Sequence, residues 1–218
     1  DIELEAVHQA MNPSKGPGQS MKSEKRKING PLYCSKAGSR LRSTFEHFVT
    51  TFIAPHVYEQ TGYRNIFFQA QPCLRFSPPA KLRIGRPHYD RMYHHQRGQI
   101  NFWIPLTSAY GTNSLWIESE PEKEDFHPLE LTYGQLARFY GNGCSHFTLP
   151  NSTPDTRVSL DLRVVPGPCF DAEALESKGV DGFPLFKVGG YYGEACIDDN
   201  GEWRIVPGTV NYSHDLVE

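Results

Sequence analysis

The sequence lacks an excess of positive charge and any long apolar run. It has 22 Lys and Arg against 25 Asp and Glu, a formal net charge of −3. Surfaces that bind nucleic acid normally carry a basic excess, so we expect no nucleic-acid partner. No apolar stretch approaches the roughly 20 residues that a membrane-spanning helix needs, so we expect no membrane contact either. The one basic segment, within residues 15–27, is interpreted as a solvated arm.

The sequence also lacks a regular spacing of cysteines. Its five cysteines are scattered and odd in number, and no two of them form a CxxC pair. This pattern indicates neither a zinc knuckle nor a disulfide framework. Reduced thiols are typical of a cytoplasmic protein, which is the location we expect.

The composition is that of a chain able to bury a sizeable core. With 218 residues, of which 38% are hydrophobic and 12% aromatic, we expect an irregular N-terminal arm over 1–38 and a single domain over 39–218. A covering helix is predicted over 41–54, ending or kinking at Pro55. Its apolar residues recur at helical spacing, with an aromatic stripe assigned to the core: Leu41, Phe45, Phe48, Val49, Phe52 and Ile53.

Beyond residue 64 the sequence consists of short alternating runs separated by Gly, Pro and Asn. These runs predict strands over 65–76, 98–106, 113–119, 135–140, 144–149 and 157–165. Several of them pair an apolar face with a polar one, which would simply meet water in an ordinary antiparallel sheet. We favour a mainly β fold with flanking helices, a double-stranded β-helix (jelly roll, cupin-like) with a polar lumen.

The C-terminal part follows the last of these runs. A short helix is predicted over 171–182. Two further strands are predicted beyond it, joined by a turn at Asp199-Asn200-Gly201.

The residues that carry chemistry begin with His88 and Asp90. Side chains two positions apart on an extended strand share a face, so both can reach one ion. Alone, this pair would more often be a hydrogen-bonded surface turn. His146 follows Asp90 by 56 residues (146 − 90), enough chain to return on a neighbouring strand. Two imidazoles and one carboxylate form the facial triad typical of non-haem Fe(II), and we set aside the nearby His94 and His95.

Arg157 begins another alternating run, 11 residues after His146 (157 − 146). On this run Arg157, Ser159 and Asp161 share one face. A guanidinium beside a hydroxyl suits a carboxylate, because its planar fork donates two parallel hydrogen bonds and stays charged. We therefore predict a carboxylate receptor next to the metal site.

The ordered set of His88-x-Asp90, His146 and Arg157-x-Ser159 resembles the Fe(II)/2-oxoglutarate-dependent oxygenases. Over residues 66–168 the chain is most similar to the small oxygenases of streptomycin-type antibiotic biosynthesis. The resemblance implies that the triad binds Fe(II) and that Arg157, with Ser159, binds the far carboxylate of 2-oxoglutarate. It also implies use of O2 to oxidise, most simply hydroxylate, a C–H bond of a substrate, with release of succinate and CO2.

Two further residues are candidates from strand alternation alone. Arg75 and Asn101 would point into the lumen, where they could bind the metal-proximal end of the cosubstrate or the substrate itself. The alternative for Arg75 is an ion pair with a nearby carboxylate such as Asp161. The substrate is expected to be a small polar molecule, in a pocket that could be shaped by Tyr89, Arg91, Trp103 and Trp116.

Two other functions remain open from the sequence. One is a cupin-like zinc hydrolase or isomerase, because zinc also accepts two imidazoles and a carboxylate. A hydrolase has no need of the carboxylate receptor at Arg157, which favours the oxygenase. The other is a non-catalytic jelly-roll binding module, in which the triad would be incidental.

Overall fold

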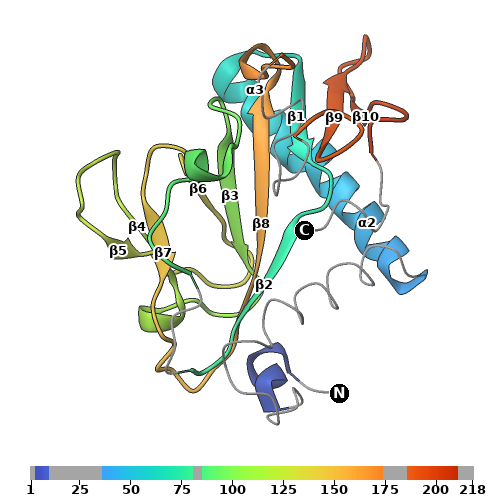
Figure 1. The fold of residues 1–218 in the computed structure, drawn as a ribbon. Helices are drawn as coiled ribbons and strands as arrows, with labels where there is room; N and C mark the ends of the chain where they lie inside the picture. Colours follow the sequence, from blue (N-terminus) through green and yellow to red (C-terminus); the bar gives the residue numbers. More distant parts are fainter. Residues whose placement is uncertain (1–2, 10–35, 81–84, 174–185, 211–218) are drawn as a thin grey trace. The chain divides into compact units, whose positions relative to one another are not determined.

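A computed structural model describes residues 3–9, 36–80, 85–173 and 186–210 (Figure 1). Within these residues no helix is both long enough and apolar enough to cross a membrane. The chain divides into two compact units. As far as they are described, the first contains residues 3–9, 73–93 and 100–162, and the second contains 36–72, 94–99 and 163–210. The predicted division into an arm over 1–38 and one domain over 39–218 stays a prediction.

The first unit has the strand connections of a jelly roll. One sheet has the order β2-β8-β3-β6 and the other the order β5-β4-β7, to which His88 adds a bridge beside β7. Successive strands along the chain mostly alternate between the two sheets, as in a double-stranded β-helix. The predicted fold class is therefore confirmed. The strands are β2 (Cys73–Ser77), β3 (Ile100–Pro105), β4 (Leu115–Ile117), β5 (His127–Pro128), β6 (Ala137–Phe139), β7 (His146–Thr148) and β8 (Arg157–Pro166).

Most runs that were predicted to form strands do contain a strand in the structure, and two differences stand out. The run 65–76 forms two strands, β1 (Asn65–Gln69) and β2, instead of one. Pro72 cannot donate a ladder hydrogen bond, and the side chain of Gln69 turns to the carbonyl of Gln71 at 2.7 Å. The short strand β5 was not predicted, because it lies in an acidic, turn-rich segment.

The second unit is built around β1, β9 (Tyr192–Ile197) and β10 (Trp203–Ile205). β9 pairs antiparallel with both β1 and β10, and β1 also pairs with the last residues of β8. The predicted C-terminal hairpin is confirmed, with Gly201 at a φ of 82° in its turn. Most of the predicted helix over 171–182 lies outside the described residues.

The predicted covering helix is longer than expected. It comprises α2 (Lys36–Phe48), a π-helical turn η2 (Val49–Ile53) and α3 (Ala54–Thr61). Pro55 does not end the helix, because it directly follows the π-helical turn, where the regular pattern of backbone hydrogen bonds is already interrupted. The ring of Phe45 packs against Phe68 of β1 at 6.2 Å between centroids.

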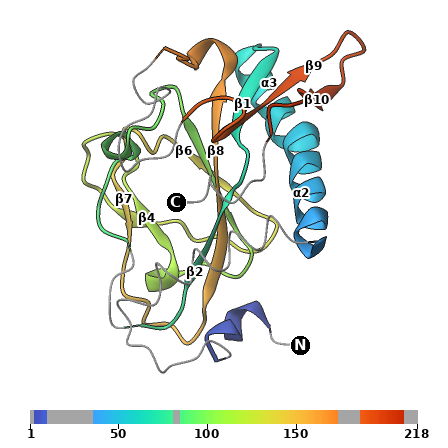
Figure 2. The same cartoon turned by 45° about the vertical axis from the view of Figure 1, so that its right-hand side comes forward.

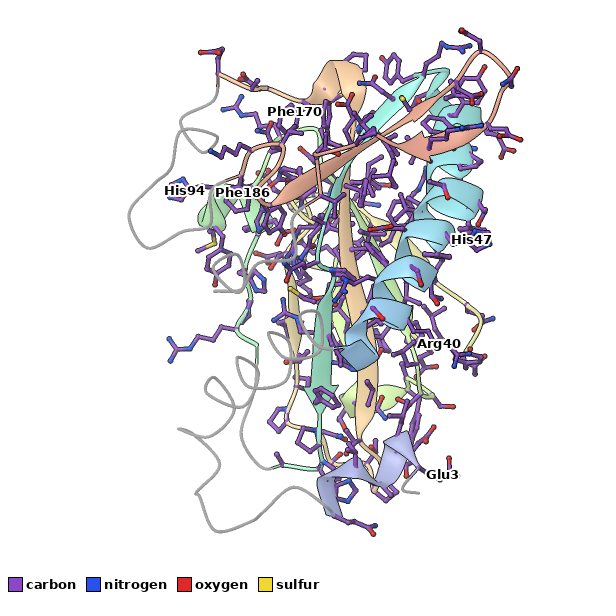
Figure 3. The ribbon with its side chains drawn as sticks, turned by 90° about the vertical axis from the view of Figure 1, so that its right-hand side faces the viewer. Glu3, Arg40, His47, His94, Phe170 and Phe186 are labelled. Atoms are coloured by element: carbon purple, nitrogen blue, oxygen red, sulfur yellow. The ribbon has the colours of Figure 1, made fainter. Side chains whose placement is uncertain are left out.

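The aromatic stripe of this helix is only partly in the core. Val49 and Ile53 are completely buried, whereas Phe52 is 47% exposed, so its assignment to the core was wrong. The reason is the π-helical turn, whose extra residue shifts the buried face by one position. On the outer face of α2, Arg40 and His47 point away from the protein (Figure 3).

Candidate metal centre

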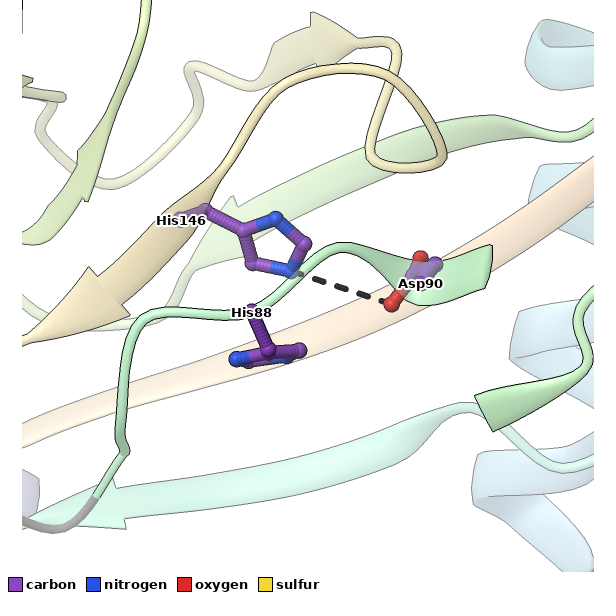
Figure 4. Close-up of side chains that lie close together, drawn as sticks. All are labelled: His88, Asp90 and His146. Atoms are coloured by element: carbon purple, nitrogen blue, oxygen red, sulfur yellow. Dashed lines mark ion pairs between the residues drawn. The ribbon is translucent and has the colours of Figure 1, made fainter. Parts of the chain in front are cut away.

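His88 and His146 are held opposite each other by the backbone. Each donates its N–H to the carbonyl of the other, at 3.2 Å and 3.0 Å. Directly opposed residues of an antiparallel pair project their side chains to the same face. The two imidazole rings accordingly lie 4.4 Å apart between centroids (Figure 4).

Asp90 reaches the same point from the start of a short 3-10 helix, η3 (Asp90–Tyr93). Its N–H donates to the carbonyl of Gly141 at 2.9 Å, which ties it to the turn before β7. His88 and Asp90 are therefore not on one continuous strand, as the sequence suggested, but they still face one point. Asp90 Oδ1 lies 3.7 Å from Nε2 of His146.

One ligand atom from each of the three residues lies within 4.8 Å of the others. Atoms that each lie about 2.0–2.2 Å from a shared ion must be this close together. Asp90 is completely buried and His146 is 6% exposed, while His88 is half-buried. Among the described residues no other group of three or more His, Cys, Asp or Glu has such an arrangement.

The backbone also orients both imidazoles. Nδ1 of His88 lies 2.7 Å from the carbonyl of Arg86, and Nδ1 of His146 lies 3.1 Å from the carbonyl of Cys144. A carbonyl only accepts, so we assign the ring proton of each histidine to Nδ1. Nε2 of each ring then carries the lone pair, an arrangement typical of metal-binding histidines.

Asn101 of β3 fixes the carboxylate. Its side-chain Nδ2 donates to Asp90 Oδ2 at 2.6 Å, which leaves Oδ1 on the side of His146. In the neighbouring strand Phe139 is the register partner of Asn101, and its ring packs edge-on against His146. The structure therefore places Asn101 against Asp90, and contact with a cosubstrate or substrate stays a prediction for it.

Gly141 is a supporting residue that the sequence did not reveal. A Cβ at this position would lie 2.6 Å from Asn101 Nδ2 and 2.9 Å from its Cγ. The side-chain amide of Asn101 cannot easily move away from such a Cβ, because it is held by its hydrogen bond to Asp90. The only sequence signal was the run Gly141-Asn142-Gly143 shortly before His146.

Glu118 is a second supporting residue that was missed. It is 2% exposed, and its carboxylate accepts the backbone N–H of Ser145 and that of Glu124. Its own N–H donates to the carbonyl of Ser145 at 3.2 Å. These bonds fix the chain immediately before His146. The sequence concealed this role, because Glu118 stands at the edge of an acidic loop.

Arg157 is a buried cation on the first residue of β8. It is 3% exposed, and its guanidinium donates from Nε to the carbonyl of Asn113 and from Nη1 to Ser159 Oγ, at 3.0 Å and 2.7 Å. No carboxylate of the described chain lies within ion-pair distance of it. Burial lowers the pKa of Arg157 to about 10, so the group keeps its charge at neutral pH. A buried charge without a counter-ion is costly, and it marks a place where an anion would be stabilised.

The guanidinium and the metal centre meet the same face of β3. Arg157 lies over the ring of Trp103 at 5.5 Å, and Asn101 holds Asp90. Two residues along a strand span about 7 Å. The two residues of β3 that contact these sites, Asn101 and Trp103, are therefore about 7 Å apart along the strand.

Arg75 makes the ion pair that was the alternative to a binding role. Its Nε donates to Asp161 Oδ2 at 2.7 Å, with the two side chains 37% and 25% exposed. β2 lies alongside β8 (Figures 1 and 2), and in their register Arg75 is opposite Ser159. Arg75 thus lies beside the carboxylate receptor, and a direct role at the metal stays a prediction.

The remaining candidates lie outside the triad, although two of them adjoin Asp90 in the chain. His94 and His95 belong to the second unit, and they are not members of the triad. Trp116 donates its indole N–H to the carbonyl of Gly111 at 3.1 Å. Tyr89 and Arg91 flank Asp90 in the chain. The guanidinium of Arg91 lies over the ring of Tyr89, 4.0 Å from its centroid.

Comparison with known proteins finds a curated relative to which this chain is similar. The chain is 32% identical over 127 residues to the streptomycin biosynthesis protein StrG of Streptomyces griseus, a match covering 58% of this chain and 59% of that protein. The chain thus matches less than two thirds of the relative's length. The predicted resemblance to proteins of streptomycin biosynthesis is confirmed by this match. No protein-family model matches the chain.

Solved structures with a similar fold include several non-haem iron enzymes. A nickel complex of the non-haem monooxygenase ThoJ has a TM-score of 0.45 at 14% identity, covering 67% of this chain and 69% of that one. The structure of CytC3 with Fe(II) and α-ketoglutarate has a TM-score of 0.46 at 16% identity, covering 97% of this chain and 84% of that one. The TM-scores are below 0.5, so the function proposed below depends on the site residues and not on these structures.

Proposed function

We propose that the protein is an Fe(II)- and 2-oxoglutarate-dependent oxygenase that oxidises, most simply hydroxylates, a C–H bond of a small polar metabolite. One observation carries the proposal. A buried, oriented set of two imidazoles and one carboxylate shares a strand face with a buried guanidinium that has no carboxylate of the described residues within ion-pair distance.

The residues of the centre fit a ferrous ion. Two neutral imidazoles and a carboxylate fill one face of an octahedron and leave the opposite positions for a chelating cosubstrate and O2. In the arrangement described above, Asp90 Oδ1 faces Nε2 of His146, and both imidazoles turn Nδ1 towards a backbone carbonyl. When bound, the iron with 2-oxoglutarate would supply the oxidising chemistry, with release of succinate and CO2.

The protein's own contribution is positioning. Asn101 keeps Asp90 from rotating, and the carbonyl acceptors keep both imidazoles in one tautomer. Arg157 would pair with the far carboxylate, while Trp103, 2% exposed, keeps water from the guanidinium. Ion pairs are stronger where water is excluded, so the receptor would hold an anion firmly.

The accessible side of the centre favours a small polar substrate. His88 is half-buried, and the ring of Tyr93, which is 44% exposed, lies 5.2 Å from it. Next to Asp90, Arg91 is anchored by the ring of Tyr89 and by the carbonyl of Asn142 at 2.9 Å. Aromatic and cationic groups beside the centre suit a molecule with hydroxyl or acidic groups.

The proposal is tested by purifying the protein anaerobically, loading it with Fe(II) and measuring succinate formed from 2-oxoglutarate and O2. We expect iron-dependent succinate formation that increases when a true substrate is added. Zinc-dependent hydrolysis or isomerisation without 2-oxoglutarate would instead support a cupin-like metalloenzyme. If the protein bound no metal, the remaining candidate function would be that of a non-catalytic binding module.

A further inference from the structure

Ser77 is the last residue of β2 and stands directly opposite Arg157 in the register of β2 and β8. In the same register Arg75 is opposite Ser159. Directly opposed side chains of an antiparallel pair lie on one face, about 4.5–5.5 Å apart between Cβ atoms. Ser77 therefore adjoins the proposed carboxylate receptor of Arg157 and Ser159.

The hydroxyl of Ser77 has no partner among the described residues. The residue is 1% exposed, and its Oγ makes no hydrogen bond. Its backbone is satisfied, because Asn151 Nδ2 donates to the Ser77 carbonyl at 2.7 Å. A buried hydroxyl is normally hydrogen-bonded, so an orphaned one requires an explanation.

We propose that Ser77 donates a hydrogen bond to the far carboxylate of the cosubstrate and completes a three-residue receptor with Arg157 and Ser159. The inference rests on the proposed function. Arg157 donates its Nε proton to Asn113 and one Nη1 proton to Ser159, so the second Nη1 proton and both Nη2 protons are left for a ligand. Ser159 accepts from Arg157, so its own proton is available. A carboxylate has about four lone-pair positions and can accept from all three residues.

This arrangement makes Ser77 a specificity residue. Its hydroxyl can help only a cosubstrate that carries a carboxylate at the end distant from the metal. A 2-oxo acid of the same length that ends in a methyl group, such as 2-oxopentanoate, gains nothing from Ser77. The difference between the two acids therefore separates a contact with the carboxylate from a general effect on the fold.

The test is calorimetric titration of Mn(II)-loaded protein with 2-oxoglutarate and with 2-oxopentanoate, for wild type and Ser77→Ala. Cys73→Ala is the matched control, because Cys73 lies on the same face of β2, opposite Asp161. We expect Ser77→Ala to weaken 2-oxoglutarate binding roughly 10- to 100-fold, the value of one hydrogen bond to a charged group. The affinities of Ser77→Ala for 2-oxopentanoate and for Mn(II) should stay within about twofold of the wild-type values. The affinities of the control variant for both acids should do the same.

Unchanged 2-oxoglutarate affinity in Ser77→Ala overturns the inference, and so does an equal loss for both acids, which would indicate a structural role. Failure of the wild type to bind 2-oxoglutarate at all would instead contradict the proposed function itself. The two failures are thus distinguishable.

Discussion

Replacing Arg157 by methionine removes the buried charge while keeping much of its volume. The cosubstrate would lose a fork of two hydrogen bonds to its far carboxylate. Each hydrogen bond to a charged group contributes about 1.5–3 kcal/mol. The loss is then about 3–6 kcal/mol, which corresponds to roughly 10²- to 10⁴-fold weaker binding of 2-oxoglutarate.

The effect on stability should be small by comparison. Arg157→Met removes two hydrogen bonds, to Asn113 and Ser159, but it also removes a buried cation that has no counter-ion in the described chain. These terms oppose each other, and we expect the free energy of unfolding to change by no more than about 2 kcal/mol.

The assay is calorimetric titration of the Mn(II)-loaded protein with 2-oxoglutarate, together with urea denaturation. Arg138→Met is the matched control, because Arg138 is an exposed arginine of β6 outside the site. Unchanged 2-oxoglutarate affinity in Arg157→Met would refute the receptor. A loss of stability of about 3–5 kcal/mol would mean that the guanidinium is structural.

Three further changes probe the metal centre. Asp90→Ala should abolish stoichiometric Fe(II) binding, measured by metal analysis after anaerobic loading, and a retained equivalent of iron would remove Asp90 from the ligand set. Gly141→Ala should push Asn101 off the carboxylate, lowering Fe(II) affinity roughly 10- to 100-fold; an unchanged affinity in a titration with a competing chelator would contradict this. Glu118→Ala should free the chain before His146 and lower the melting temperature, because two backbone donors lose their acceptor; calorimetric melting at the wild-type temperature would show that water replaces the carboxylate.

The grouping of His88, Asp90 and His146 could be predicted because it depends on residue type and order. Imidazole and carboxylate groups have few other reasons to occur as His88-x-Asp90 followed by a distant His146. The strand pattern of the first unit was also predictable, since alternation with period two is a local property. The exact backbone was not, and Asp90 begins a 3-10 helix instead of continuing a strand.

The supporting residues could not be predicted because they depend on register between distant strands. Asn101 meets Asp90, and Ser77 meets Arg157, only once the sheets have formed. Alternation along one strand indicated that Asn101 faces the lumen, but which residue it meets depends on the pairing of strands that are distant in the sequence. The π-helical turn after α2 was hidden for a related reason, since a single added residue changes which side of the helix is buried.

The most direct test of the central claim is a crystal structure of the protein with Fe(II) and 2-oxoglutarate, grown without oxygen, with the metal located by anomalous scattering at the iron edge. We predict one iron bound by His88, Asp90 and His146, with the far carboxylate of 2-oxoglutarate on Arg157. Iron bound elsewhere, or 2-oxoglutarate without contact to Arg157, would contradict the account.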